Sequence, residues 1–213
     1  MIKLEHVVKK IKNKMILDDI NFVFHEGRIY GLYGINGSGK TMILRAISGL
    51  LLPDGGEIWV DGKMLGKDID FPESIGLIIE NMEMLGQYDA KTNLEIIGKI
   101  KKVATVEDIA YILERVGLQQ FDGLKVKKYS LGMKQRLNIA QAMFENPDCI
   151  LLDEPFNALD DEGRRMLADL LLEEKGKGKT IIIAHHYREE LEKICDEVLE
   201  VNAGAIVCGE GNF

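Results

Sequence analysis

The stretch GINGSGKT, residues 34–41, decides the fold class of this 213-residue chain. It has the pattern G-x-x-x-x-G-K-[ST], and it lies between an apolar run (28–33) and a helix-like run (40–48). Glycines let the backbone curve around a phosphate, whose charge the N–H groups at a helix N-terminus stabilise. The flanking runs disfavour the alternative, a chance glycine turn. The stretch therefore predicts a phosphate-binding loop between a strand and a helix.

The polar residues of this loop have distinct expected roles. The Lys40 ammonium would neutralise the β- and γ-phosphates, and the Thr41 hydroxyl would be a ligand of Mg²⁺. Nucleoside triphosphatases and small-molecule kinases both carry such loops, so the loop alone predicts nucleotide binding and not the reaction. The other expected nucleotide contacts in this segment are Gly34, Asn36, Gly37, Ser38, Gly39 and Met42.

A pair of acids follows a second apolar run, CILLDEP at residues 149–155. A buried strand would bring Asp153 to the sheet edge beside the phosphate loop, where its carboxylate can hold Mg²⁺ through water. Glu154, one residue further, can orient and deprotonate the attacking water. A surface turn with acids before Pro155 is the simpler alternative, and the phosphate loop makes it less attractive. The two motifs together predict hydrolysis of a nucleoside triphosphate.

The overall composition is that of an ordinary soluble protein. Hydrophobic residues make up 46% and charged residues 29%, and the net charge is −8, which argues against nucleic acid as a partner. The longest apolar runs are far shorter than the roughly 18–20 residues of a membrane span, and the first residues lack a signal-peptide pattern. Three widely spaced cysteines (149, 195 and 208) support neither a disulfide framework nor a metal site, and fit a reducing cytoplasm.

Short strands and helices alternate along the chain. Apolar runs at 149–152 and 180–183 indicate strands buried on both faces of a mainly parallel sheet. Thr92 and Thr105 each begin a stretch that resembles a helix capping box. We therefore expect an α/β fold with a β-rich N-terminal flank and a helical insertion between about residues 83 and 145. We expect one domain over residues 1–213.

Three further motifs carry a family resemblance. YSLGMKQR (129–136) stands before a helix and upstream of the acidic strand, NALD (157–160) follows that strand, and IAHHY (183–187) ends the next apolar run. In this order and spacing they resemble the signature motif, the D-loop and the switch-histidine segment of the ATP-binding-cassette (ABC) ATPases. The resemblance covers essentially the whole chain. It implies a P-loop NTPase core with an antiparallel N-terminal β subdomain and a helical subdomain that carries the signature.

The resemblance also implies how the site works. Two subunits would pair head to tail, as a homodimer or as a heterodimer with a related ATPase, with two ATP molecules at the interface. Each ATP would contact the phosphate loop of one subunit and Ser130 and Gly132 of the other. The family register favours His186 as the contact of the γ-phosphate, with His185 in the place of a serine. The catalytic residues would then be Lys40, Glu154 and His186, although a histidine at a strand end is more often structural.

The chain departs from the family pattern at several positions. Ile11 stands where many members have an aromatic residue that stacks on adenine. Glu80 stands in the place of the Q-loop glutamine and would be a third Mg²⁺ ligand beside Thr41 and Asp153. Leu131 and Met133 replace a glycine and a glutamine of the signature. The signature form and Glu80 are similar to the bacitracin- and lantibiotic-resistance exporter branch.

The predicted function is that of a cytoplasmic ATPase subunit, peripheral to the inner face of the cell membrane. It would power a separate membrane permease, with export of a peptide, antibiotic or similar compound. Residues 82, 84 and 85 fall where the family contacts its permease, although core packing explains them nearly as well. A soluble ABC-type ATPase not coupled to transport is the alternative. The long coiled-coil insertion of chromosome-type members is absent between Thr41 and Ser130, and translation-type members usually carry two cassettes.

Overall fold

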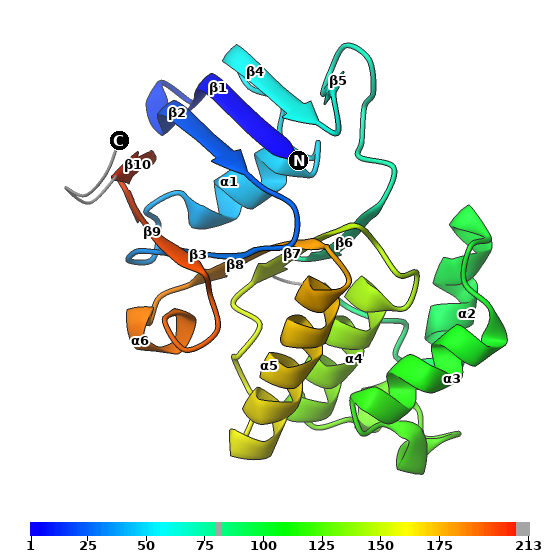
Figure 1. Cartoon of the computed structure of the whole chain (residues 1–213). Helices are drawn as coiled ribbons and strands as arrows, with labels where there is room; N and C mark the ends of the chain where they lie inside the picture. Colours follow the sequence, from blue (N-terminus) through cyan, green and yellow to red (C-terminus); the bar gives the residue numbers. More distant parts are fainter. Residues whose placement is uncertain (80–81, 208–213) are drawn as a thin grey trace.

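Two β-sheets form the framework of the computed structural model, which describes residues 1–79 and 82–207 (Figure 1). The smaller sheet is antiparallel, and its strand order is β2-β1-β4-β5. It confirms the predicted β-rich N-terminal flank. Its strands are β1 (Ile2–Ile11), β2 (Lys14–Phe24), β4 (Gly55–Val60) and β5 (Lys63–Met64).

The larger sheet has the strand order β10-β9-β3-β8-β7-β6. Every pair in it is parallel except β9 with β10, which confirms the predicted mainly parallel sheet. The strand before the phosphate loop, β3, lies between β8 and β9. The strands are β3 (Ile29–Tyr33), β6 (Ile75–Ile78), β7 (Cys149–Asp153), β8 (Thr180–His185), β9 (Glu197–Asn202) and β10 (Ala205–Val207).

The helices lie on both faces of the larger sheet. The first, α1, lies between the two sheets, and α4 and α5 cover the opposite face, with α2 and α3 beyond them (Figure 1). No helix among the described residues is both long and apolar enough to cross a membrane. The helices are α1 (Lys40–Ile47), α2 (Ala90–Lys101), α3 (Val106–Arg115), α4 (Leu131–Met143), α5 (Asp161–Gly176) and α6 (Arg188–Leu191), with 3₁₀ turns η1 (Gln119–Phe121) and η2 (Val126–Lys128).

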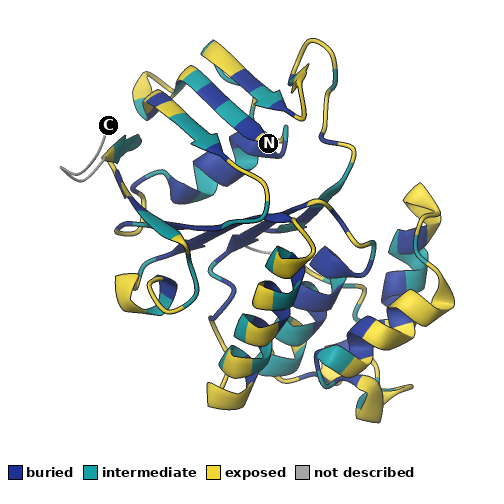
Figure 2. Ribbon diagram, in the orientation of Figure 1, coloured by how far each residue is buried: buried dark blue, intermediate teal, exposed yellow. Residues whose placement is uncertain are grey.

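The central strands are buried, as their dark blue colour in Figure 2 shows, and their side chains pack into two hydrophobic cores on opposite faces of the sheet. Along β7, Ile150 and Leu152 pack into the core on the side of α4 and α5. Cys149 and Leu151 pack into the core with α1 and the antiparallel sheet. This alternation follows from the two-residue period of a strand, and burial on both faces explains the continuous apolar runs in the sequence.

The helix caps agree with the sequence at one position and correct it at another. Thr105 forms the predicted capping box, with Asp108 as its reciprocal partner. The capping box expected at Thr92 is wrong. The N-cap is Asp89, whose carboxylate accepts the Thr92 N–H at 2.8 Å, so α2 begins at Ala90 instead. A carboxylate at the N-cap stabilises free N–H groups of the first turn, so Asp89 can begin the helix earlier.

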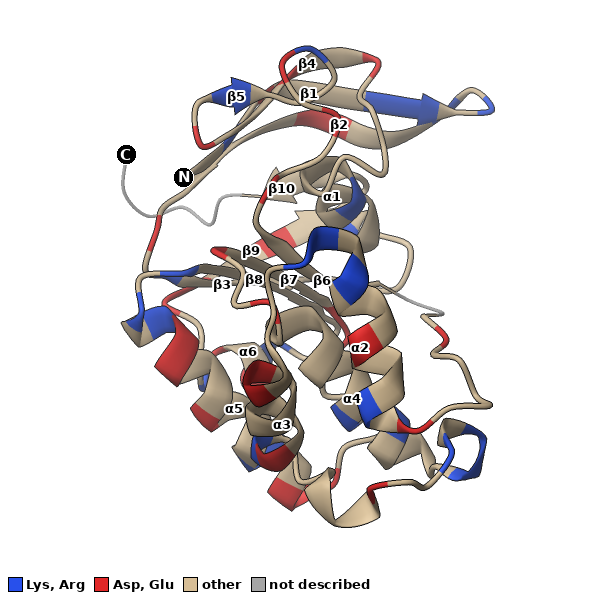
Figure 3. Ribbon diagram, turned by 90° about the vertical axis from the view of Figure 1, so that its right-hand side faces the viewer, with Lys and Arg blue, Asp and Glu red and all other residues tan. Residues whose placement is uncertain are grey.

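Charges of both signs mingle over the helical layer (Figure 3). Arg115 of α3 and Glu173 of α5 form an ion pair at 2.5 Å. The hydrogen bond from Arg115, with help from Lys177, lowers the pKa of Glu173 to about 2. Since the Glu173 carboxylate is largely solvated, we regard the pair as a link between two helices and not as a main source of stability.

Candidate nucleotide-binding and catalytic site

The phosphate loop connects β3 to α1, as its motif requires. The backbone at Gly39 has a φ of +116°, which side chains with a Cβ rarely adopt. A Cβ on Gly34 would lie 2.3 Å from the Val201 carbonyl oxygen of β9. Glycine is therefore needed at both positions, one for its conformation and one for close packing against the sheet.

Lys40 lies folded against this loop. Its ammonium Nζ donates hydrogen bonds to the carbonyl oxygens of Gly34 at 2.6 Å and Ile35 at 3.2 Å. Only 5% of the residue is exposed. The cation is thus already positioned at the loop, where it can interact with a bound anion without a large rearrangement.

Two of the three expected oxygen ligands of Mg²⁺, Thr41 and Asp153, lie side by side. Thr41, at the start of α1, donates a hydrogen bond from Oγ1 to Oδ2 of Asp153 at 2.7 Å. Asp153 is the last residue of β7 and is buried. A hydroxyl and a carboxylate are the hard oxygen donors that Mg²⁺ prefers. The donor chemistry at this edge of the sheet therefore fits the ion.

A cavity of about 720 Å³ opens over the loop. Its size lies within the range of ligand pockets. Within the loop, the Ser38 hydroxyl is buried and has no hydrogen-bond partner among the described residues, which fits a polar ligand bound at the loop. The cavity includes loop residues that the sequence predicted and others that it missed; the lining is Lys14, Met15, Ile16, Asn36, Gly37, Gly39, Lys40, Thr41, Met42, Arg45, Asp153, Glu154, Ala203 and Gly204.

Apart from Arg45 of α1, the lining residues that the sequence missed come from the β1–β2 hairpin and the β9–β10 turn. Gly204 packs so closely that a Cβ there would lie 2.5 Å from the Ile16 carbonyl oxygen. Neither segment has a motif that points to a nucleotide. Ile11, which stands in the expected stacking position, is partly exposed and is not among the lining residues.

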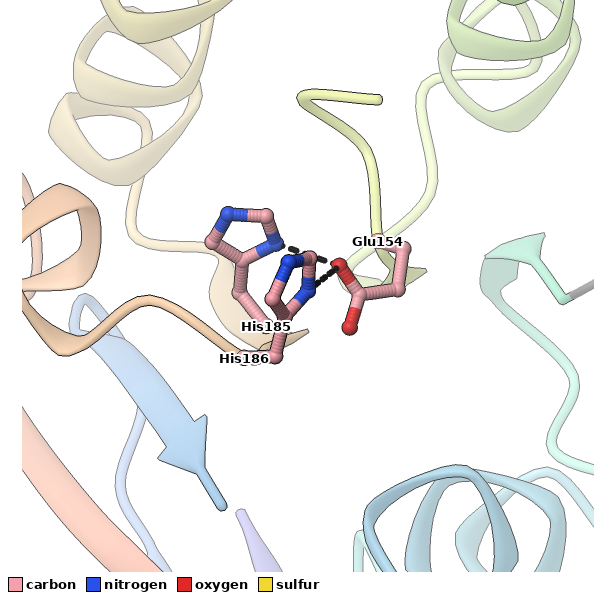
Figure 4. A group of neighbouring side chains, drawn as sticks. All are labelled: Glu154, His185 and His186. Carbon is pink, nitrogen blue, oxygen red and sulfur yellow. Dashed lines mark hydrogen bonds and ion pairs between the residues drawn. The ribbon is translucent and has the colours of Figure 1, made fainter. Parts of the chain in front are cut away.

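Glu154 lies one residue beyond β7, in a left-handed backbone conformation with a φ of 49°. Its Oε2 contacts Nδ1 of His185 at 2.5 Å and Nδ1 of His186 at 2.8 Å (Figure 4). Burial by itself raises the pKa of this carboxyl, but the hydrogen bonds and charges of the two histidines outweigh it and lower the pKa. Glu154 is therefore held as a carboxylate, the form that accepts a proton.

The two adjacent histidines have different surroundings. The side chain of His186 is 30% exposed, whereas that of His185 is 2% exposed. Nε2 of His185 contacts Oε2 of Glu190 at 2.8 Å, and Glu190 also pairs with Arg164 of α5. The sequence placed His185 only as a substitute for a serine, and it missed this link from Glu154 through His185 to Glu190.

The signature residues Ser130 and Gly132 lie away from the phosphate-loop cavity. Ser130 is the N-cap of α4, and its hydroxyl accepts the Met133 N–H at 3.2 Å. Ser130, Gly132 and Asp160 all line a second cavity of about 430 Å³. Neither Ser130 nor Gly132 lines the cavity over the phosphate loop. Within one chain, the structure thus does not bring the two predicted sets of nucleotide contacts together.

Two predictions concern the segment after β6. Glu80 lies outside the described residues. Of the residues expected at a permease contact, Met84 packs against the helical core, whereas Leu85 is 43% exposed. The sulfur of Met82 lies 3.4 Å from the backbone nitrogen of Ile79.

Comparison with known proteins identifies the family. The ABC transporter family matches residues 17–157. The uncharacterized ABC transporter ATP-binding protein YybJ of Bacillus subtilis (strain 168) is 55% identical over 210 residues, 99% of this chain and 96% of that protein. The lantibiotic transport ATP-binding protein SrtF of Streptococcus pyogenes is 33% identical, over 97% of this chain and 89% of that protein. This relative agrees with the predicted similarity to lantibiotic exporters.

The fold comparison agrees with this result. The dimeric structure of a post-hydrolysis state of the ATP-binding cassette MJ0796, bound to ADP and Pi, superimposes with a TM-score of 0.85. It covers all of both chains at 24% identity, so it shows the shared fold. The matched family, the relatives and the nucleotide motifs agree: the chain belongs to the ABC transporter family, as one of its ATP-binding ATPase subunits.

Proposed function

We propose that Lys40, Glu154 and His186 perform ATP hydrolysis in this subunit. Lys40 binds the β- and γ-phosphates, together with the backbone N–H groups of the loop. Glu154 accepts the proton of the attacking water, and His186 contacts the γ-phosphate. Thr41 and Asp153 would hold Mg²⁺, which supplies charge neutralisation at the phosphates. The lowered pKa of Glu154 keeps its side chain ionised, which a proton acceptor requires.

We also propose Glu80 as a further ligand of Mg²⁺. Its role rests on the family register alone. A Glu80→Gln variant keeps an oxygen ligand and loses the charge, so it should need more Mg²⁺ for half-maximal ATPase activity. Mg²⁺ dependence identical to that of wild type would exclude a metal role for Glu80.

We further propose that two subunits assemble head to tail, with each ATP bound between the phosphate loop of one and the signature of the other. The observation that carries this proposal is the separation of the two cavities within one chain. Ile35 of the phosphate loop and Leu131 of the signature are each 74% exposed, which is costly for large apolar side chains in water. A head-to-tail partner would cover both.

A mixing experiment tests this assembly. Lys40→Ala damages the loop half of a site, and Ser130→Arg damages the signature half. In a mixed dimer both changes fall in one composite site, and the other site is intact. At an ATP concentration near the wild-type Kd, we expect more ATPase activity in the mixture than in either variant alone. An inactive mixture with demonstrated heterodimers would contradict the shared site.

The subunit's transport role is proposed from its relatives. We infer that it lies at the inner face of the cell membrane and drives a separate permease that exports a peptide, an antibiotic or a similar compound. The relative SrtF, a lantibiotic transport protein, supports this class of cargo. Co-purification with the product of a neighbouring permease gene would test it, with the Leu85→Glu variant as a probe of the contact. A subunit that stays alone and hydrolyses ATP would favour the soluble alternative.

A further inference from the structure

The carboxylate of Glu154 and the two histidines form a cluster with the chemistry of a metal site. Oε2 of Glu154 and one ring nitrogen from each of His185 and His186 lie within 4.8 Å of one another. The three side chains point toward a common centre at the ends of β7 and β8 (Figure 4). Two imidazoles and one carboxylate are a ligand set that Zn²⁺ uses, with a fourth position left for water.

The surroundings of His185 orient it as a ligand. Its Nε2 contacts the Glu190 carboxylate at 2.8 Å, and this contact leaves Nδ1 toward Glu154. Glu190 is itself held by its ion pair with Arg164. Metal-bound histidines usually have such a carboxylate on the ring nitrogen that faces away from the metal, because it fixes the ring and the tautomer. The contacts of His185 with Glu190, and of Glu190 with Arg164, are therefore those expected around a metal-bound histidine.

We propose that Glu154, His185 and His186 bind Zn²⁺ through Oε2 and the two Nδ1 atoms. The ion would replace the protons that the carboxylate and the rings now share. Oε2 lies 2.5 and 2.8 Å from the two Nδ1 atoms, whereas ligand atoms around a tetrahedral Zn²⁺ are about 3.3 Å apart, so the side chains would separate to admit the ion. This site differs in chemistry from the Thr41 and Asp153 pair. Two nitrogen donors favour Zn²⁺ over Mg²⁺, which prefers an all-oxygen set.

Zinc at this site would inhibit the enzyme. A carboxylate that is bound to Zn²⁺ is a much weaker base, so Glu154 could no longer accept the proton of the attacking water, and hydrolysis would stop while the phosphate loop stays intact. This consequence, unlike the binding itself, rests on the proposed role of Glu154. The two statements can therefore be tested separately.

Other zinc ligands in the chain can be controlled. Burial raises the pKa of the Cys149 and Cys195 thiols to about 12, so these thiols compete poorly for the metal at neutral pH. Cys208 lies outside the described residues, and a Cys208→Ser background removes it. His6, an exposed histidine that contacts the single carboxylate of Asp19 at 2.8 Å, serves as the matched control.

The test is a Zn²⁺ titration of the nucleotide-free Cys208→Ser protein against a chromogenic chelator. We expect one Zn²⁺ per chain. His186→Ala and Glu154→Gln should each weaken binding at least tenfold, and Glu190→Gln, which removes the orienting carboxylate, by about 10–100-fold. His6→Ala should bind as the parent does. Because His185 is buried and its loss can unfold the chain, the conclusion does not depend on a His185 variant.

Two results would overturn the proposal: no stoichiometric Zn²⁺, or a His186→Ala/Glu154→Gln double variant that binds as tightly as the parent. ATPase assays of the parent at buffered free Zn²⁺ form the second part. Inhibition with the same apparent affinity supports both the site and the role of Glu154. Zinc binding that is lost in the variants but leaves the parent's ATPase rate unchanged supports the metal site and contradicts the role of Glu154 as the base.

Discussion

The phosphate-loop cavity and the signature cavity lie at the N-termini of two helices, α1 and α4, but they are equipped differently. The first has a cation in Lys40, the hydroxyl of Thr41 and the carboxylate of Asp153, which we propose as Mg²⁺ ligands, and the Glu154 carboxylate. The second has the Ser130 hydroxyl and the Gly132 backbone beside the ion pair of Arg136 with Asp160. A helix N-terminus attracts an anion in both cases. Only the first has the groups for chemistry, so the second is suited to bind what the first cleaves.

The two cavities are nevertheless physically linked. Gln135, in the second turn of α4, donates a hydrogen bond from Nε2 to the Pro155 carbonyl oxygen at 2.9 Å. Pro155 directly follows Glu154. The signature helix therefore contacts the segment that holds the proposed base, so a movement of α4 would also displace the backbone next to Glu154. Because the two cavities have different groups, we expect substitutions in the first to reduce hydrolysis or ATP binding, and substitutions in the second to reduce dimerisation.

The largest effect is expected for Glu154→Gln, which keeps the shape of the side chain and removes the base. Loss of a general base typically costs about 10²–10⁴-fold, so kcat should fall by that factor. ATP should still bind with unchanged affinity, and an ATP-bound dimer should accumulate. Steady-state ATPase kinetics and size-exclusion chromatography measure these quantities. A kcat within about threefold of wild type would remove Glu154 from the chemistry.

A smaller effect, and on binding, is expected for Lys40→Ala. Hydrogen bonds to charged groups contribute about 1.5–3 kcal/mol, which corresponds to an ATP affinity weaker by about 10- to 150-fold. Calorimetric titration with ATP measures the change, and Lys40→Arg is the control that keeps the charge. Near-normal affinity of Lys40→Ala would contradict the assignment of the loop.

A selective effect on assembly is expected for Ser130→Asp. Aspartate is as good an N-cap as serine, so the stability of α4 should not change. Its negative charge would face the γ-phosphate of the partner's ATP, so ATP-dependent dimerisation should weaken by at least about tenfold, since two unit charges near 4 Å interact by several kcal/mol at a protein surface. The ATP affinity of the monomer should stay at the wild-type value. Weaker ATP binding by the monomer would contradict the proposal that Ser130 contacts only the ATP of the partner subunit.

The smallest effect is expected for Thr105→Ala, away from both cavities. The hydroxyl of Thr105 accepts the Asp108 N–H at 3.1 Å at the start of α3. Loss of such a cap costs about 1 kcal/mol of the free energy of unfolding. Urea denaturation measures this loss, and Thr105→Ser should restore most of it. The ATPase rate of folded Thr105→Ala should equal that of wild type.

The sequence predicted those parts of the fold whose structure is determined mainly by local properties of the residues. The phosphate loop, the buried strands β7 and β8 and the Thr105 cap each follow from glycine chemistry, apolar runs or side-chain hydrogen bonds. The hairpin of β1 and β2 was not predicted in detail. Its turn has positive φ values at Lys12 and Asn13 without a glycine, so the usual turn signal is missing.

The candidate site was predictable only where motif residues carry it. Asp153 and Thr41 were expected to lie together, and the Thr41 Oγ1 is 2.7 Å from Oδ2 of Asp153. The contact of His185 with Glu190 and the ion pair of Glu190 with Arg164 could not be predicted, because they join α5, β8 and α6 through side chains that have no sequence pattern in common. The wall formed by Ile16 and Gly204 was missed for the same reason: it is tertiary packing between distant segments.

The position of β3 between β8 and β9 has a consequence for synthesis of the chain. The antiparallel sheet is complete once residue 64 has emerged, but the strands that pair with β3 begin about 150 residues after it. At ribosomal rates of about 5–20 residues per second, β3 and its loop wait for about 8–30 s without their neighbours. We therefore expect that a nascent chain does not bind ATP before β8 has emerged. Ribosome-bound chains stalled before residue 180 should have a protease-sensitive phosphate loop.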